Sequence, residues 1–220
     1  MSGIIVVGNG GHARACLDAF PAADFSRVIG CTGFDAESRI QVPYLGTDDE
    51  ILRGFDGDLP LVFVALGDNA LRARVTAAVL EQGFSLYTLI APSASVAPTA
   101  IIEPGAAIMR GAIVGAYAAV GAGAIINTAA SIDHDCTVGS FAHVAPGSRL
   151  AGTVTVGERA LIGVGASLIP GISVGADGIV GAGAAVVRDV PPGATAVGVP
   201  ARVISGGSSI DSNMQVRTFC

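Results

Sequence analysis

From Val96 to Val186 a large aliphatic residue recurs at every sixth position without a break. A second column, four positions after the first, consists almost entirely of small residues, chiefly alanine. A period of six matches neither the 3.6-residue repeat of an α-helix nor the two-residue alternation of a long strand. It is the signature of a hexapeptide β-helix, in which short strands wind around a narrow prism. We therefore expect one large and one small side chain to point inward from each repeat.

Glycine is frequent directly after the large aliphatic residue, as at Gly115 and Gly121. Because glycine adopts positive φ at little cost, we expect these glycines to form the turns between the short strands. The uncharged stretch 111–132 is long enough to span a bilayer. Its large apolar residues recur at a period that is not helical, however, and the rest is mostly glycine and alanine. The pattern favours the β-helix over a transmembrane segment.

The first ninety residues follow a different pattern. Apolar runs at 4–7, 27–35, 59–66 and 85–90 predict four strands, and helices are expected from about His12 and from residue 70 to about Gln82. Alternating strands and helices indicate a small, Rossmann-like parallel sheet. We therefore predict three parts: an α/β domain over 1–90, a β-helix over 91–204 and a loose polar tail over 205–220.

Charge and cysteine usage narrow the possible partners. The chain has 12 Lys and Arg against 18 Asp and Glu, a formal net charge of −6, and no basic run. This argues against nucleic acid and anionic membranes as partners. The four cysteines form no CxxC pair, and the amino-terminal segment lacks the basic region of a signal peptide. The expected location is the cytoplasm.

Several motifs resemble those of the hexapeptide acyltransferases. The stretches INTAASIDHDCTVG, HVAPGSRLAGTVTVG and AVGVPARVI are similar to the bacterial nucleotide-sugar N-acetyltransferases, which are related to sialic-acid O-acetyltransferases. The similarity runs from about Gly3 to Ile204. It implies a left-handed β-helix with triangular coils of about 18 residues, a homotrimer with sites between subunits, and acetyl-CoA in the groove between neighbouring helices.

The resemblance also implies the reaction. Acetyl-CoA would donate its acetyl group to the amino group of a nucleotide-linked amino sugar, with a 4-amino-4,6-dideoxy sugar as the expected acceptor, in surface-glycan synthesis. Neither a metal nor a covalent enzyme intermediate is expected, and Cys136 falls in the inward column of small residues. Whether the nucleotide is UDP, GDP or dTDP stays open.

His134 is the candidate general base. A coil of the implied length places this outward imidazole beneath Gly152, whose N–H has no side chain to shield it and could stabilise an oxyanion. A carboxylate on the other ring nitrogen would orient the imidazole, and both Asp133 and Asp135 are available. The resemblance assigns that role to Asp135. The residues alone also allow a solvated turn.

The remaining site residues are carried over from the same resemblance. The turn at Gly8-Asn9-Gly10-Gly11 precedes a predicted helix, whose amino terminus can accept a phosphate. Arg72 and Arg74 follow on the second helix and are expected on a solvated face. The residues assigned to the nucleotide sugar are Gly8, Gly10, Gly11, His12, Asp35, Gly67, Asn69 and Asn127. Those assigned to acetyl-CoA are His143, Gly152 and Ala182.

The sequence leaves four other functions to consider. Acetylation of a hydroxyl on a sugar or sialic acid is the alternative within the same class. The Gly-Asn-Gly turn is close to a dinucleotide fingerprint and would suit an NAD-dependent dehydrogenase, but the predicted sheet is half of the fold that such a cofactor needs. A zinc-binding hexapeptide carbonic anhydrase requires three histidines, and the repeat segment holds two. A non-catalytic scaffold predicts no activity that depends on His134.

Overall fold

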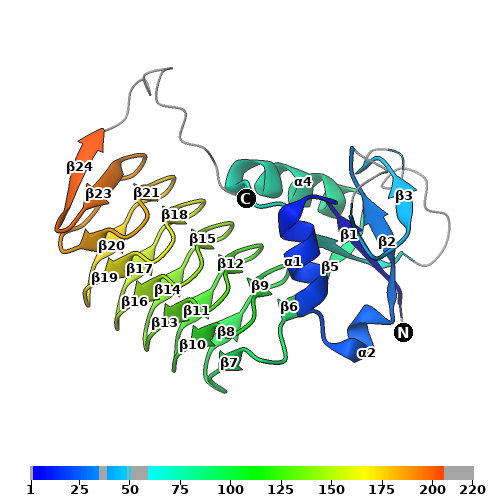
Figure 1. The fold of residues 1–220 in the computed structure, drawn as a ribbon, viewed down its shortest axis with the longest axis horizontal. Coiled ribbons are helices and arrows are strands. Elements are labelled where there is room, and N and C mark those ends of the chain that lie inside the picture. Colours follow the sequence, from blue (N-terminus) through cyan, green and yellow to red (C-terminus); the bar gives the residue numbers. More distant parts are fainter. Residues whose placement is uncertain (1, 35–38, 49, 51–58, 206–220) are drawn as a thin grey trace.

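The computed structural model describes residues 2–34, 39–48, 50 and 59–205. Figure 1 shows a small α/β domain packed against one end of a long β-helix, which extends away from it coil by coil. The amino-terminal segment lies on the α/β domain, at the far end of the molecule from strand β24. None of the helices in the described ranges is both long and apolar enough to cross a bilayer.

The α/β domain contains one five-stranded parallel sheet in the order β3-β2-β1-β4-β5. Its central strand β1 is buried at every residue, because parallel strands are covered on both faces. The strands are β1 (Ile4–Val7), β2 (Val28–Thr32), β3 (Tyr44–Gly46), β4 (Leu61–Val64) and β5 (Ser85–Leu86). The helices are α1 (Gly11–Ala19), α2 (Ala22–Phe25) and α4 (Asn69–Glu81).

The predicted parallel sheet is confirmed, with differences at its edges. Strand β3 and the single turn α2 were not predicted, because each is short and carries no clear apolar run. Strand β2 ends at Thr32, earlier than expected, and Asp35 lies outside the described residues. The predicted strand over 85–90 is split in two. Its first half, β5, pairs with β4, whereas β6 (Leu89–Ile90) pairs with β9 of the β-helix.

The β-helix has three parallel sheets, one for each side of the prism. From Leu89 to Leu168, each strand pairs with the strand 18 residues later, as Ile113 does with Ser131. Sheet one contains β7 (Ser95–Val96), β10 (Ile113–Val114), β13 (Ser131–Ile132), β16 (Arg149–Leu150), β19 (Ser167–Leu168) and β22 (Ala185–Val186). Sheet two contains β8 (Ile101–Ile102), β11 (Ala119–Val120), β14 (Thr137–Val138), β17 (Thr155–Val156) and β20 (Ser173–Val174).

Sheet three is the side that the α/β domain covers. It contains β6, β9 (Ala107–Ile108), β12 (Ile125–Ile126), β15 (His143–Val144), β18 (Leu161–Ile162), β21 (Ile179–Val180), β23 (Thr195–Gly198) and β24 (Ala201–Ser205). The last two strands form an antiparallel hairpin at the end of the sheet. Ala107, Met109 and Ile125 face outward from sheet three and are buried in the same apolar cluster as β1 and α1. The two parts of the chain therefore share a core.

The two inward columns are confirmed. The large aliphatic residues and the small residues four positions later form one continuous buried cluster along the prism. The glycines after the aliphatic column, however, have a different role from the predicted one. A Cβ at Gly115 would lie 2.7 Å from the carbonyl carbon of Asp133, and one at Gly121 would lie 2.6 Å from the nitrogen of Ser140. Neither glycine has positive φ. They allow adjacent coils to stack closely.

Positive φ occurs instead two residues further on, at the centre of the turns. Some of these positions are glycine, such as Gly123, but others are Tyr117, Asp135 and Phe141. A left-handed backbone costs a non-glycine residue about 1–2 kcal/mol. The turn geometry therefore comes from the hydrogen bonds between stacked coils, which hold even a tyrosine and a phenylalanine in this conformation.

Replacing Ile126 with alanine is expected to destabilise the protein by about 2–5 kcal/mol, because its fully buried side chain leaves a cavity in the narrow prism. Ile101 is the matched control, since its side chain is exposed on the outside of sheet two. The same substitution there should change stability by less than about 0.5 kcal/mol. Urea denaturation of both variants measures the difference. Equal losses would contradict the inward placement of Ile126.

Candidate active site

His134 lies on the turn between β13 and β14, on an edge of the prism. Its side chain is 57% exposed, and its Nδ1 donates a hydrogen bond to Asp135 Oδ2 at 2.7 Å. Asp135 has positive φ (58°), a conformation that aspartate tolerates better than most residues. Asp133 Oδ1 instead accepts from the backbone N–H of His134 at 2.7 Å. The two carboxylates thus have different roles: Asp133 caps the turn, and Asp135 contacts the imidazole.

Gly152 occupies the same turn position one coil further along. A Cβ on this residue would lie 2.5 Å from His134 Nε2 and 2.6 Å from its Cε1, so the imidazole rests against the glycine. The next residue, Thr153, donates its N–H to the His134 carbonyl at 2.9 Å. Among the described residues the Gly152 N–H has no protein acceptor. The structure thus brings His134, Asp135 and Gly152 together.

The electrostatics of this turn favour protonation of the imidazole. The hydrogen bond to Asp135, and next the charge of Asp133, raise the pKa of His134 above its ordinary value of 6.5. A base with a raised pKa holds its proton more strongly once it has accepted it. The ring's other nitrogen, Nε2, is the atom left to meet a substrate, because Nδ1 is engaged by Asp135.

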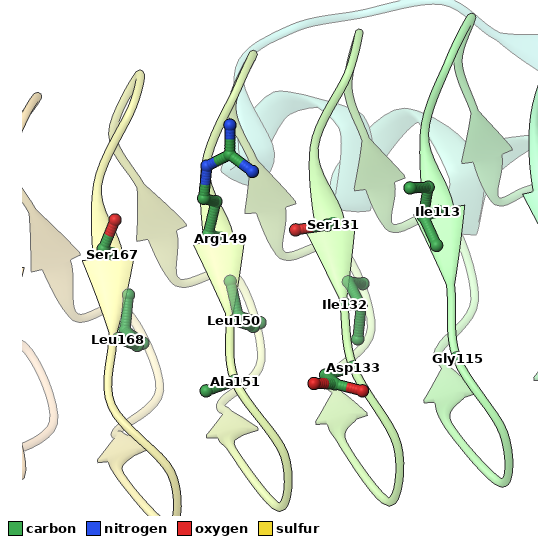
Figure 2. Close-up of a pocket in the computed structure, with 10 residues that line it drawn as sticks. All are labelled: Ile113, Gly115, Ser131, Ile132, Asp133, Arg149, Leu150, Ala151, Ser167 and Leu168. Atoms are coloured by element: carbon green, nitrogen blue, oxygen red, sulfur yellow. The ribbon is translucent and has the colours of Figure 1, made fainter.

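A shallow groove leads to this turn across the outer face of sheet one. Figure 2 shows Ser131, Arg149 and Ser167 in a row on successive strands, with the Arg149 guanidinium extending from the face. Asp133 and Ala151 line the same groove, and they directly precede His134 and Gly152 in the chain. The groove therefore ends beside the imidazole and forms an extended surface that carries the positively charged side chain of Arg149.

A second cluster lies where the α/β domain meets sheet three. The rings of His12, on α1, and His143, on β15, have centroids 6.3 Å apart. Asn127 Nδ2 lies 2.9 Å from His143 Nε2. Cys16 Sγ lies 3.4 Å from His12 Nε2. Three of the predicted site residues, distant in sequence, are therefore neighbours.

The contacts of Asn127 define the tautomer of His143. Asn127 Oδ1 accepts from the backbone N–H of Thr128 at 2.8 Å, so its amide nitrogen faces the imidazole. His143 Nε2 is therefore an acceptor, its proton is on Nδ1, and the backbone of Gly67 hydrogen-bonds to the ring. Burial, then the charge of Arg72, lower the pKa of His12 to about 4 and that of His143 to about 3. Both rings are neutral near pH 7.

The glycine turn lies beside this second cluster. Gly8 has a φ of 110°, and a Cβ there would lie 2.9 Å from the Ala65 carbonyl oxygen, so the turn requires glycine. A Cβ at Gly10 would meet nothing within 4 Å, which leaves space above the amino terminus of α1. Gly67 follows β4, the strand adjacent to β1. Unshielded amides at the start of a helix beside a parallel sheet suit a phosphate.

One predicted residue lies away from both clusters, and another is not described. Ala182 is exposed on the turn between β21 and β22, on a different edge of the prism from His134. Asp35 lies outside the described residues. The two clusters themselves are on opposite sides of the prism, because sheet three faces the α/β domain and the His134 turn joins the other two sheets.

Comparisons with known proteins show the family of this chain. Residues 3–79 match the model of the PglD N-terminal domain family. The perosamine N-acetyltransferase PerB from Caulobacter crescentus, solved with CoA and GDP-perosamine, is 42% identical, with 93% of this chain and 98% of that chain covered and a TM-score of 0.87. The acetyltransferase domain of PglB from Neisseria gonorrhoeae, solved with acetyl coenzyme A, is 35% identical, with 92% and 99% covered and a TM-score of 0.85. The chain belongs to the nucleotide-sugar N-acetyltransferase family.

The resemblance found in the sequence is thus confirmed, and the fold is the left-handed β-helix of hexapeptide repeats with an α/β domain in front. WeeI from Acinetobacter baumannii, 20% identical over 93% of this chain and 100% of that chain, shares the fold with a TM-score of 0.83. As a member of its family, this N-acetyltransferase uses acetyl-CoA as co-substrate. In the described part of the chain, no group of three or more His, Cys, Asp or Glu side chains is arranged to hold a metal ion.

The predicted exposure of one residue of this N-acetyltransferase was wrong. Arg72 was expected on a solvated face, but it is 1% exposed and lies between the α/β domain and the β-helix. Arg74, two residues later, is exposed as predicted. The two arginines are indistinguishable by local pattern, because what buries Arg72 is a set of turns more than fifty residues away in the chain.

Proposed function

We propose that this protein transfers the acetyl group of acetyl-CoA to the amino group of a GDP-linked 4-amino-4,6-dideoxy sugar. The observation that carries the proposal is the exposed His134 imidazole, which is held by Asp135 and in contact with Gly152. The nucleotide is suggested by the 42% identical PerB, whose structure contains GDP-perosamine.

The proposed chemistry is a direct transfer within a ternary complex. The sugar amine attacks the thioester carbonyl, and His134 Nε2 takes the proton that the amine loses. The Gly152 N–H stabilises the oxyanion that forms, which is worth about 10²–10³-fold in rate for one such donor. Asp135 stabilises the imidazolium through Nδ1. When the C–S bond breaks, the sulfur of CoA receives that proton and the amide product remains.

The substrates are assigned to different surfaces. We place the nucleotide phosphates at the Gly8–Gly11 turn and the sugar near His12, Gly67, Asn69 and Asn127. The arm of acetyl-CoA is placed along the groove of sheet one, where Arg149 can face a phosphate and Gly152 lies at the end. Ala182 and His143 are assigned to acetyl-CoA on the resemblance alone.

A homotrimer would complete this site. In one chain the His134 turn and the His12–His143 cluster lie on opposite sides of the prism. A sugar held by one subunit can reach a His134 only if a neighbouring subunit supplies it. We therefore propose a trimer with its sites between subunits, located in the cytoplasm. A monomer mass of 21.7 kDa by light scattering would overturn this assembly.

The first experiment is acetyl transfer to a panel of UDP-, GDP- and dTDP-linked 4-amino-4,6-dideoxy sugars. Release of the CoA thiol from acetyl-CoA is followed with a thiol reagent, and mass spectrometry identifies the product. The expected result is turnover with the GDP-linked sugars and addition of one acetyl group as an amide, stable to hydroxylamine. Turnover with another nucleotide alone would correct the substrate but keep the reaction. An ester product on a sugar hydroxyl would establish O-acetylation instead.

A further inference from the structure

The buried guanidinium of Arg72 makes five hydrogen bonds, all of them to neutral oxygens. On its own domain it donates to the carbonyls of Leu66 and Gly67, at 2.9 and 3.1 Å, and to Asn69 Oδ1 at 2.8 Å. On the β-helix it donates to the carbonyls of Gly123 and Phe141, both at 2.7 Å. One side chain thus joins the loop after β4 to two separate coils.

The acceptors on the β-helix are equivalent positions of successive coils. Gly123 and Phe141 are 18 residues apart, and Arg159 follows at the same interval. Asn69 Nδ2 donates to the Arg159 carbonyl at 2.9 Å and to the Ala160 carbonyl at 3.2 Å. The first turn of α4 therefore contacts three successive rungs of one column of turn carbonyls.

The backbone of these turns explains why the carbonyls are available. Gly123, Phe141 and Arg159 all have positive φ, between 55° and 61°. Their N–H groups donate to the preceding coil, at Pro104, Ala122 and Ser140 in that order. The carbonyls of the same residues make no such bond to the next coil among the described residues, and they accept instead from Arg72 and Asn69.

We infer that Asn69 and Arg72 form a positioning pair that fixes the α/β domain against the β-helix and so holds the Gly8–Gly11 turn and His12 beside His143. Adjacent coils are separated by about 4.8 Å, so a shift by one coil would carry the sugar out of reach of the acetyl group. The pair reaches the site through Gly67, whose carbonyl accepts from Arg72 and whose backbone hydrogen-bonds to the His143 ring.

Other contacts also hold the α/β domain against the β-helix. Arg110, on a neighbouring edge of the prism, forms an ion pair with Asp18 of α1, and both side chains are more than half exposed. An exposed pair of this kind contributes about 0–1 kcal/mol. The apolar contacts of Met109 and Ile125 bury area and also favour this coil, since the residues at the same positions one coil further on are Asn127 and His143. Arg72 and Asn69 add directional bonds.

The catalytic consequence rests on the proposed function, and kinetics test it with Arg72→Met, Arg72→Lys and the exposed control Arg74→Met. We expect Arg72→Met to lower kcat by about 10²-fold, because each substrate still binds its own part of the chain but the reacting atoms are misplaced. Both KM values should stay within about threefold of wild type. Arg72→Lys keeps the charge but not the planar fork, and an intermediate kcat is expected. Arg74→Met should behave as wild type.

A second measurement does not depend on activity. The chain has three histidines, so NMR can follow each imidazole separately against pH. His12 faces Arg72 and Cys16, and His143 faces Arg72, His12 and Asn127. In the wild type we expect His12 and His143 to stay neutral between pH 5.5 and pH 8, because burial lowers both pKa values. In Arg72→Lys the charge remains, so a pKa of His12 or His143 that rises into this range reports lost burial and a displaced domain.

These results test the positioning pair and the proposed function separately. If Arg72→Met lowers only the melting temperature, and kcat and the histidine titrations stay as in wild type well below that temperature, the inference is overturned. If the wild-type protein acetylates none of the amino sugars, the proposed function fails, whereas titration of His12 or His143 in Arg72→Lys still supports the positioning pair. If His12 and His143 titrate as in the wild type in both Arg72 variants, the positioning pair is overturned, whatever the activity assays give.

Discussion

Replacing His134 with alanine is expected to lower kcat by about 10²–10⁴-fold, which is the usual contribution of a positioned general base. The side chain is more than half exposed and makes no contact with the buried cluster of the prism. The melting temperature should therefore change little, and the loss can be assigned to chemistry. Thiol release from acetyl-CoA, at saturating nucleotide sugar, measures the effect. A variant that kept a tenth or more of wild-type kcat would remove His134 from the mechanism.

The pH dependence provides an independent check on the same residue. The base must be neutral to accept a proton, so kcat/KM should fall as the pH drops through the pKa of His134, which lies above 6.5. Asp135→Asn removes the largest cause of that raised pKa. In this variant we expect the acidic limb of the profile to move to lower pH, with a lower plateau because the ring is less well oriented. An unmoved limb would assign the titration to another group.

The sequence predicted those features that repeat. Each residue of the inward columns recurs many times, so the fold is specified by a pattern that a single exception cannot obscure. The predicted role of the glycines that follow the aliphatic column was wrong. Close stacking and positive φ both favour glycine, and the sequence alone does not distinguish the two causes. The folded structure places Gly115 against the backbone of the next coil and Asp135 in the left-handed turn.

The unpredicted features depend on how the α/β domain lies on the β-helix. His12 and His143 were proposed separately, and their closeness follows from the contact of α1 with sheet three. Arg72 was assigned to solvent because a charged residue on a helix is usually exposed. Two of its five oxygen acceptors, the carbonyls of Gly123 and Phe141, are more than fifty residues away in the chain, and no local pattern brings them to Arg72. Tertiary packing decided both cases.

Gly152→Ala is expected to reduce kcat by about 10²-fold with little change in stability. Gly152 does not have positive φ, so alanine fits the backbone without strain. Its methyl group, however, would lie 2.5 Å from His134 Nε2, and the imidazole would have to move. Because Nδ1 is bound to Asp135, this movement either breaks that bond or turns Nε2 away from the amine.

Gly165→Ala is the matched control, since it is expected to give the opposite result. Gly165 has a φ of 67°, and a Cβ there would meet nothing within 4 Å. Alanine should therefore cost about 1 kcal/mol of stability through backbone strain and leave kcat unchanged. Thermal melts and thiol-release kinetics of both variants distinguish a steric effect on the base from a general weakening of the turns.

The double variant His134→Ala/Gly152→Ala decides how the methyl group acts. If it acts only by displacing the imidazole, it has nothing left to displace once His134 is alanine. The double variant should then have the kcat of His134→Ala alone, which is complete non-additivity of two residues in contact. If the two losses multiply instead, the methyl group interferes with the thioester or with the Gly152 N–H, and the contribution of that amide is separate from the base. Either rate can be measured with the same thiol-release assay, and a multiplied loss would contradict the steric account.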